Sequence, residues 1–135
     1  MAPLLDPKVV ALGAAIQIGV AVPTAVLVSA ARQDDLGADS NLWLVGAFLI
    51  LVVGPAAAGA FVGRRRPDSP MLHAATATGT AWALLTAVSL VRAALAGDEL
   101  VPLLLILLTI APIQIGIGVL GTFFSRPRRQ PEETL

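Results

Sequence analysis

Charged residues divide the chain into four stretches that contain no charge. The stretches are 23, 24, 23 and 26 residues long, and they lie between Lys8 and Arg32, Asp39 and Arg64, Asp68 and Arg92, and Glu99 and Arg126. A helix that crosses a bilayer needs roughly 20 apolar residues, so each stretch is long enough for one crossing and too short for two. The pattern predicts four helices, at residues 9–31, 42–63, 71–95 and 100–124.

Composition favours a membrane protein over a soluble one. Of the 135 residues, 56% are hydrophobic and 13% are charged. A soluble helical bundle needs a polar face on each helix, and none of the four stretches has one. We expect an all-α fold, a four-transmembrane-helix bundle that forms one domain over residues 1–125. The polar tail at residues 126–135 is broken by proline, so we expect it to be disordered.

The first stretch also has a feature of secretory signals. Val28-Ser29-Ala30 resembles the small-residue site that follows a signal peptide. The apolar run before it is longer than a usual signal core, and Asp6 lies beside Lys8 ahead of it. We therefore expect this stretch to remain as the first membrane span, with cleavage as the alternative.

A short basic turn joins the second and third predicted helices. Arg64, Arg65 and Arg66 lead into it, and Pro67 and Pro70 bracket it. Each proline lacks a backbone donor and disfavours the helical conformation at the preceding residue, so one helix cannot run through both. The two helices should therefore form a hairpin whose ends lie at the same face of the membrane.

The loops at the two faces differ in positive charge. One set of loops and termini carries seven Lys and Arg residues, and the other carries two. Short loops rich in Lys and Arg stay in the cytoplasm, so both termini should be cytoplasmic in the plasma membrane of a bacterium. Basic side chains at this face should contact anionic headgroups. They are Arg64, Arg65, Arg66, Arg126, Arg128 and Arg129.

Small residues recur at helical spacing near the end of the second predicted helix. Gly54, Gly59 and Gly63 belong to this group, and the last two form a G-x-x-x-G pair. Such pairs allow two helix backbones to approach closely in lipid. The chain contains 12 glycines, so a chance spacing without a packing role is the alternative.

Two glutamines lie within the first and fourth predicted helices. Gln17 is nine residues from Lys8, and Gln114 is twelve residues from Arg126. The difference of three residues corresponds to about 4–5 Å of helix rise, so the two amides should lie at similar depth. A buried amide in hydrocarbon requires a partner, which favours a Gln17–Gln114 hydrogen bond. This bond would make the first and fourth helices neighbours and close the bundle as a ring. The alternative is that each amide bonds elsewhere.

The third predicted helix carries the most polar side chains. Thr76 and Thr80 are candidates for polar contacts inside the membrane, although a threonine hydroxyl can also bond to its own helix. His73 lies at the cytoplasmic start of the same helix, where we expect an interfacial residue rather than a catalyst.

Several kinds of chemistry lack the residues they need. The chain has no cysteine and one histidine, and no Asp, Glu or Lys lies deep in a predicted helix. Proton-coupled transporters usually need such a charged group. We expect no cofactor, no enzymatic activity and no nucleic-acid partner. The leading hypothesis is an accessory or packing subunit whose partners are the bilayer and a homo-oligomer or larger membrane complex.

The alternative hypothesis is an oligomeric small channel, transporter or holin-like pore. Four short helices cannot enclose a wide pore, so several copies would be required. Gln17, Gln114, Thr76 and Thr80 would then have to line one water-filled path.

The turn region also resembles a known group of proteins. Residues Gly63 to Ala74 read GRRRPDSPMLHA. This segment resembles the hairpin of small uncharacterised four-span membrane proteins of actinobacteria, in which a helix ending in glycine and arginine leads into a Pro-Asp-x-Pro turn. The resemblance covers twelve residues of 135. It implies a four-span membrane class and no activity or site.

Overall fold

The computed structural model describes residues 5–33 and 41–125, and its regular elements over these ranges are all helical. In chain order they are α1 (Pro7–Gln33), α2 (Leu42–Phe48), the π-helical turn η1 (Leu49–Val53), α3 (Gly54–Arg65), α4 (Pro70–Ala96), α5 (Leu100–Gly121) and the 3₁₀ turn η2 (Thr122–Ser125).

Four segments are long and apolar enough to cross a membrane. They are Pro7–Ala31, Leu42–Arg65, Pro70–Ala96 and Leu100–Ser125. The predicted all-α fold with four membrane-crossing helices is therefore confirmed, and the helix bounds expected from the charge pattern differ from these by two residues or fewer. The predicted disordered tail, residues 126–135, lies outside the described residues.

Residues with restricted or unusual backbone conformations define the helix ends. Pro7 and Pro70 each occupy the first turn of a helix, where the missing N–H would have no partner in any case. Gly97 ends α4 with φ of 77°, a left-handed conformation that favours glycine. Ser69 occupies the N-cap of α4, but its hydroxyl makes no capping bond.

The second span is not a uniform α-helix. The π-helical turn Leu49–Val53 separates α2 from α3. Pro55 lies two residues after this turn, and its ring lacks an N–H and would clash with the carbonyl four residues earlier in a regular α-helix. The wider turn therefore accommodates Pro55 within a continuous span.

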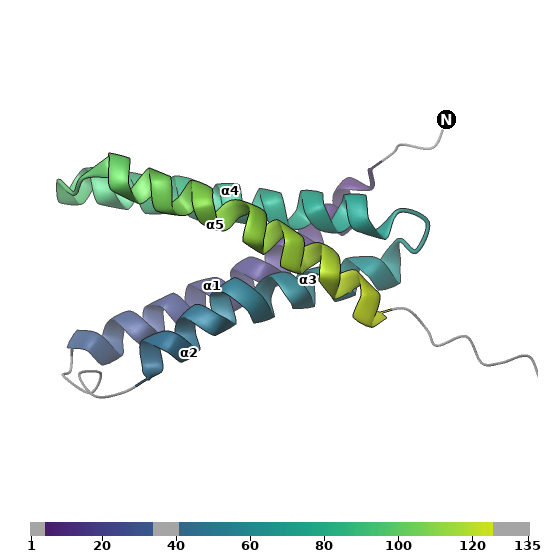
Figure 1. The fold of residues 1–135 in the computed structure, drawn as a ribbon, viewed down its shortest axis with the longest axis horizontal. Helices are drawn as coiled ribbons and strands as arrows, with labels where there is room; N and C mark the ends of the chain where they lie inside the picture. Colours follow the sequence, from purple (N-terminus) through teal and green to yellow (C-terminus); the bar gives the residue numbers. More distant parts are fainter. Residues whose placement is uncertain (1–4, 34–40, 126–135) are drawn as a thin grey trace, which may run out of the picture.

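The spans form two helix pairs that diverge from one end. α1 lies beside α2 and α3, and α4 lies beside α5; the pairs pack together at the end that holds the 66–69 turn and separate toward the other (Figure 1). No Cα atom of α2 lies within 8 Å of one in α4 or α5. We call the end where the pairs pack together, which holds the 66–69 turn, the closed end, and we call the other end the open end. The chain enters α1 and leaves η2 at the closed end (Figure 1).

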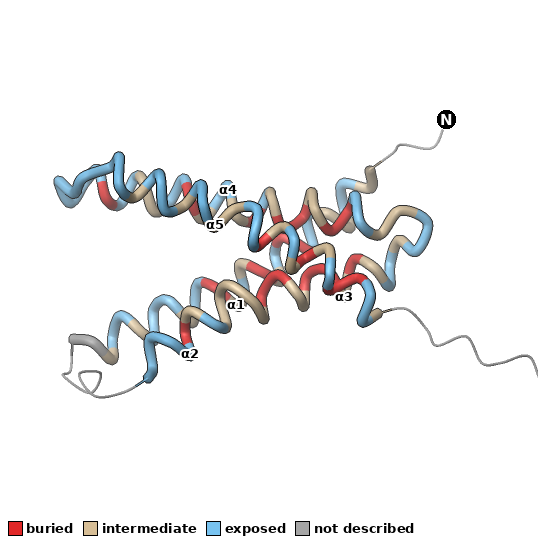
Figure 2. The backbone as a smooth tube through the Cα atoms, viewed as in Figure 1, coloured by how far each residue is buried: buried red, intermediate tan, exposed pale blue. Residues whose placement is uncertain are grey.

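Most of the buried residues lie toward the closed end (Figure 2). Ala58, Val62, Ala74 and Ala77 are all fully buried, and three of these four side chains are alanine. Lipid tails are as apolar as leucine, so helices in a membrane associate through close packing of small residues rather than through burial of large ones. The distribution of small residues therefore fixes where the helices meet.

The closest packing between α3 and α5 depends on glycine. A Cβ atom built at Gly59 would overlap the carbonyl oxygen of Gly118 and lie 2.8 Å from its carbonyl carbon. One turn later, a Cβ at Gly63 would lie 3.1 Å from the Cα of Thr122. Gly59 and Gly63 thus lie where one backbone rests on another, which is the packing role that their spacing favoured.

We predict that Gly59→Ala lowers the free energy of unfolding in detergent by about 1–3 kcal/mol, because the methyl group forces α3 and α5 apart. Gly116→Ala is the matched control, since a Cβ there would have no neighbour within 4 Å. The control should be neutral or slightly stabilising, because alanine is the better helix former. Equal effects of the two substitutions would contradict the proposed packing role.

Candidate functional site

The two glutamines meet in the centre of the bundle. The Nε2 of Gln17 in α1 donates to the Oε1 of Gln114 in α5, with 3.0 Å between the two atoms. Gln17 is fully buried and Gln114 is 4% exposed. The structure thus brings together the two glutamines that the sequence analysis paired because of their similar expected depth in the membrane.

The helices that carry these glutamines are nevertheless not neighbours. No Cα of α1 lies within 8 Å of a Cα of α5, whereas α3 and α4 each contact both of these helices and each other. The bundle closes as a ring in which α1 and α5 occupy opposite corners. The expectation that a Gln17–Gln114 bond requires adjacent helices was therefore wrong, because two long amide side chains can span the diagonal.

Small residues on the intervening helices leave room for this diagonal contact. Gly54 lies directly against Gln17, since a Cβ built there would be 3.6 Å from the Gln17 Cγ. A methyl group at the predicted packing glycine at the start of α3 would thus meet the Gln17 side chain at ordinary van der Waals distance. Any larger residue at Gly54 would extend toward the space that the Gln17 side chain occupies.

One atom of the pair remains without a partner. Over the described part of the chain, Gln17 Oε1 is buried and accepts no hydrogen bond. A buried unpaired polar atom costs roughly 1–3 kcal/mol, which offsets much of what the Gln17–Gln114 bond contributes. The pair therefore acts mainly to fix the register of α1 against α5.

The two threonines named as candidates do not join this pair. Thr76 donates from Oγ1 to the carbonyl oxygen of Leu72 in its own helix at 2.8 Å, and Thr80 is exposed. Thr78, which sequence analysis did not select, is fully buried and bonds to Ala74 O at 2.8 Å. Thr78 also packs on Gly118, since a Cβ on that glycine would lie 2.9 Å from its Oγ1.

A second polar cluster lies at the closed end, around His73. This residue is fully buried, not exposed at a surface as an interfacial histidine would be. Its Nε2 accepts from the backbone N–H of Asp6 at 2.9 Å, which places the ring hydrogen on Nδ1, where the carbonyl oxygen of Ser69 accepts at 2.9 Å. The imidazole therefore ties the segment before α1 to the start of α4.

Asp6 also caps α1 and pairs with the basic turn. Its Oδ1 accepts from the N–H of Lys8 at 3.0 Å and of Val9 at 3.4 Å, and its Oδ2 lies 3.4 Å from a guanidinium nitrogen of Arg66. Partial burial opposes ionisation of Asp6, but these backbone donors and Arg66 outweigh it, so its pKa falls below the ordinary 3.8. Arg66 also bonds to Asp68 at 2.9 Å, and this bond lowers the pKa of Asp68.

The sequence analysis missed this cluster, although a signal was present. Asp6-Pro7 is the combination expected at the N-cap and first position of a helix. No sequence pattern pointed from Asp6 to His73, since the two residues are 67 positions apart.

The arginines expected at the headgroups fall into three groups. Arg64 and Arg65 are exposed, and the Arg65 guanidinium lies 5.4 Å from the centre of the Phe61 ring. Arg66 forms the ion pairs described above. The other three lie outside the described residues, and they are Arg126, Arg128 and Arg129.

Comparison of this chain with protein-family models, curated proteins and solved structures finds no match. Among the described residues, no group of three or more His, Asp or Glu side chains could hold a metal ion. The arrangement around the Gln pair and around His73 consists of contacts between helices. Its hydrogen bonds connect segments that are distant in the chain.

We predict coupling between Gln17 and Gln114 in a double-mutant cycle, with unfolding followed in detergent. Each single change to leucine leaves one buried amide unpaired and should cost about 1–3 kcal/mol. The double variant should cost less than the sum of the two by about 0.6 kcal/mol, the usual size of a polar contact between membrane helices.

Thr76→Val combined with Gln17→Leu serves as the control, because Thr76 bonds within its own helix. That combination should be additive. Additive effects for the Gln17 and Gln114 pair as well would show that the hydrogen bond does not couple the two helices.

Proposed function

We propose that this protein is a non-enzymatic accessory or packing subunit in the plasma membrane of a bacterium. Its four apolar helices are those of a small integral membrane protein. The resemblance of Gly63–Ala74 to small four-span proteins of actinobacteria fits this proposal.

The observation that carries the proposal is the way in which polar groups inside the spans are used. Gln17 bonds to Gln114, and Thr76 and Thr78 bond to carbonyl groups of α4 itself. The glutamine contact joins two helices and the threonine contacts stay within one helix, so these polar groups are used inside the described fold. A subunit whose polar groups serve its own packing is suited to assembly with other membrane proteins.

The oligomeric pore receives less support from the same contacts. It would need Thr76 and Thr80 to line a common path with Gln17 and Gln114. Thr80 is exposed, whereas Gln17 is fully buried, so these side chains do not converge.

Two measurements on the full chain test the function. We predict that purified protein in liposomes moves ions and small solutes no faster than empty vesicles do. We also predict that extraction from native membranes in mild detergent recovers a defined membrane protein with it, in a fixed ratio. Solute flux well above the empty-vesicle control would reject the accessory role and favour the pore. Recovery of the chain alone would also count against the accessory role.

We further propose that the closed end faces the cytoplasm, which places both termini there. The 66–69 turn at this end contains Arg66 and follows Arg64 and Arg65, and short basic segments stay on the cytoplasmic side. Reporter fusions after Leu135 and within residues 33–40 should report cytoplasmic and periplasmic positions, respectively. The opposite assignment at either site would overturn this orientation.

A further inference from the structure

The helix pairs lose contact with each other toward the open end, and this change can be followed along one face of α4. Ala77, Val88 and Leu95 are separated by nearly whole numbers of helical turns, so they share a face. Their exposure rises from 0% at Ala77 to 67% at Val88 and 85% at Leu95. At the closed end this face packs on α1, since a Cβ at Gly13 would lie 2.9 Å from that of Ala77. At the open end Val88 and Leu95 are exposed, and among the described residues α2 makes no contact with α4.

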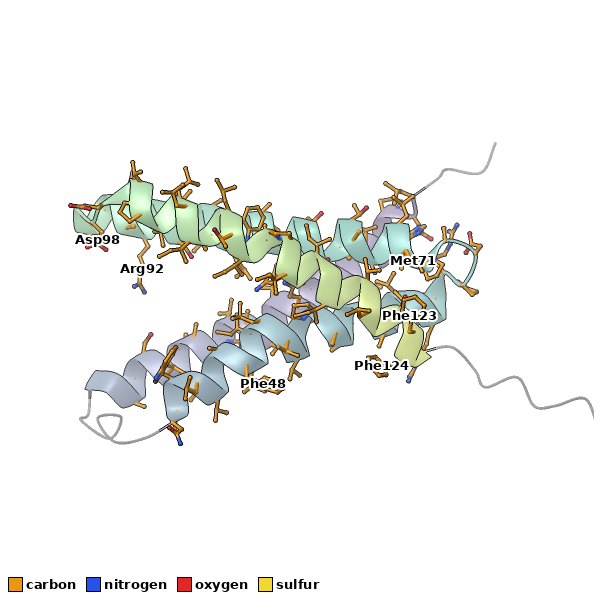
Figure 3. All side chains as sticks on the ribbon, in the orientation of Figure 1. Phe48, Met71, Arg92, Asp98, Phe123 and Phe124 are labelled. Atoms are coloured by element: carbon orange, nitrogen blue, oxygen red, sulfur yellow. The ribbon has the colours of Figure 1, made fainter. Side chains whose placement is uncertain are left out.

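A positive charge lies on this open part of α4. Arg92 projects from α4 into the region between the two helix pairs (Figure 3). It is exposed, and within residues 5–33 and 41–125 it forms no ion pair with a carboxylate. It precedes Gly97 by five residues, so its Cα lies about 7 Å inside the end of the helix. A guanidinium at this depth in a bilayer requires an anionic partner or a path to the headgroups.

Two negative charges lie at the tip of the same helix pair. Asp98 and Glu99 follow the left-handed Gly97, and both are exposed. Asp98 marks the outermost part of the hairpin in Figure 3. Along the direction of the helices, the open end therefore presents a positive group deeper in the membrane and negative groups at its boundary.

This order of charges matches one class of membrane component. A zwitterionic phospholipid carries its phosphate next to the hydrocarbon and its ammonium group further out. The phosphate would meet Arg92, which forms strong charge-assisted bonds with phosphate oxygens, and the ammonium would meet Asp98 and Glu99. A headgroup with phosphate alone would satisfy Arg92 but would also be repelled by the two carboxylates.

We propose that the open end binds a zwitterionic phospholipid that has a primary ammonium headgroup. Its acyl chains lie on the part of the exposed apolar face of α4 that is deeper than Arg92, which includes Val88. Its phosphate binds Arg92, and its ammonium group binds Asp98 and Glu99. The lipid thus lies against the part of α4 that is exposed in the described structure and that α2 does not contact.

Lipid retention by the full chain tests this site. The protein is reconstituted in nanodiscs of equal parts phosphatidylethanolamine and phosphatidylglycerol and then released into mild detergent, and retained lipids are counted by native mass spectrometry. The unaltered chain should retain phosphatidylethanolamine in preference to phosphatidylglycerol. Arg92→Gln should reduce that retention about fivefold, the effect of losing one basic contact. Lys8→Gln, an exposed basic residue at the other end, should leave it unchanged.

A second variant separates the two charges. Asp98→Asn with Glu99→Gln should abolish the preference for phosphatidylethanolamine while the phosphate contact to Arg92 persists. These positions are exposed, so the variants should fold, and helical circular dichroism checks this. The proposal is overturned if Arg92→Gln retains as much phosphatidylethanolamine as the unaltered chain. It is also overturned if the unaltered chain retains phosphatidylglycerol equally well. The same holds if the variant with Asp98→Asn and Glu99→Gln keeps the preference for phosphatidylethanolamine.

A photoreactive residue locates the lipid. Placed at Val88, it should cross-link to phosphatidylethanolamine in the unaltered background and much less in Arg92→Gln. Placed at Leu120, an exposed position of α5 near the closed end, it should show no dependence on Arg92. A cross-link from Val88 to a protein chain instead of lipid would overturn the proposal and identify a partner helix as the occupant. The accessory role has its own test in co-purification, so the lipid site and the accessory role can fail separately.

Discussion

The structure depends on one constraint of the bilayer: apolar surface alone gives no reason for helices to associate, because the surrounding lipid is equally apolar. Association must come from close approach of backbones and from polar contacts that lipid cannot supply. In this chain both are concentrated at the closed end. Gly59 rests on Gly118 there, and Gln17 bonds to Gln114 nearby. Where these features stop, the two helix pairs diverge.

The buried polar groups of the bundle differ in what they do. The Gln17–Gln114 contact leaves one carbonyl oxygen unpaired, so it specifies a register more than it stabilises the fold. His73 instead links two segments that are distant in the chain through backbone groups at both of its ring nitrogens. Together these clusters position α1 relative to α4 and α5 at two depths. Both clusters are used in contacts within the fold, which supports the proposed accessory role.

The asymmetry between the two ends has a functional consequence. The closed end is packed by protein, carries an ion-paired turn and holds both ends of the described chain. The open end presents apolar faces, with Arg92 and the Asp98–Glu99 pair at its rim. We propose that a membrane lipid covers these exposed apolar faces. The order of its charges is the reason to assign that place to a phospholipid.

The sequence by itself determined the four spans, because charged residues in hydrocarbon are costly and their positions therefore mark the helix ends within about two residues. It also indicated the equal depth of Gln17 and Gln114, since helix rise is constant. Only the tertiary structure decided that α1 and α5 lie on a diagonal, that Asp6 reaches His73, and that the helix pairs diverge. Depth follows from counting residues along one helix, whereas lateral arrangement depends on which small residues of different helices pack together.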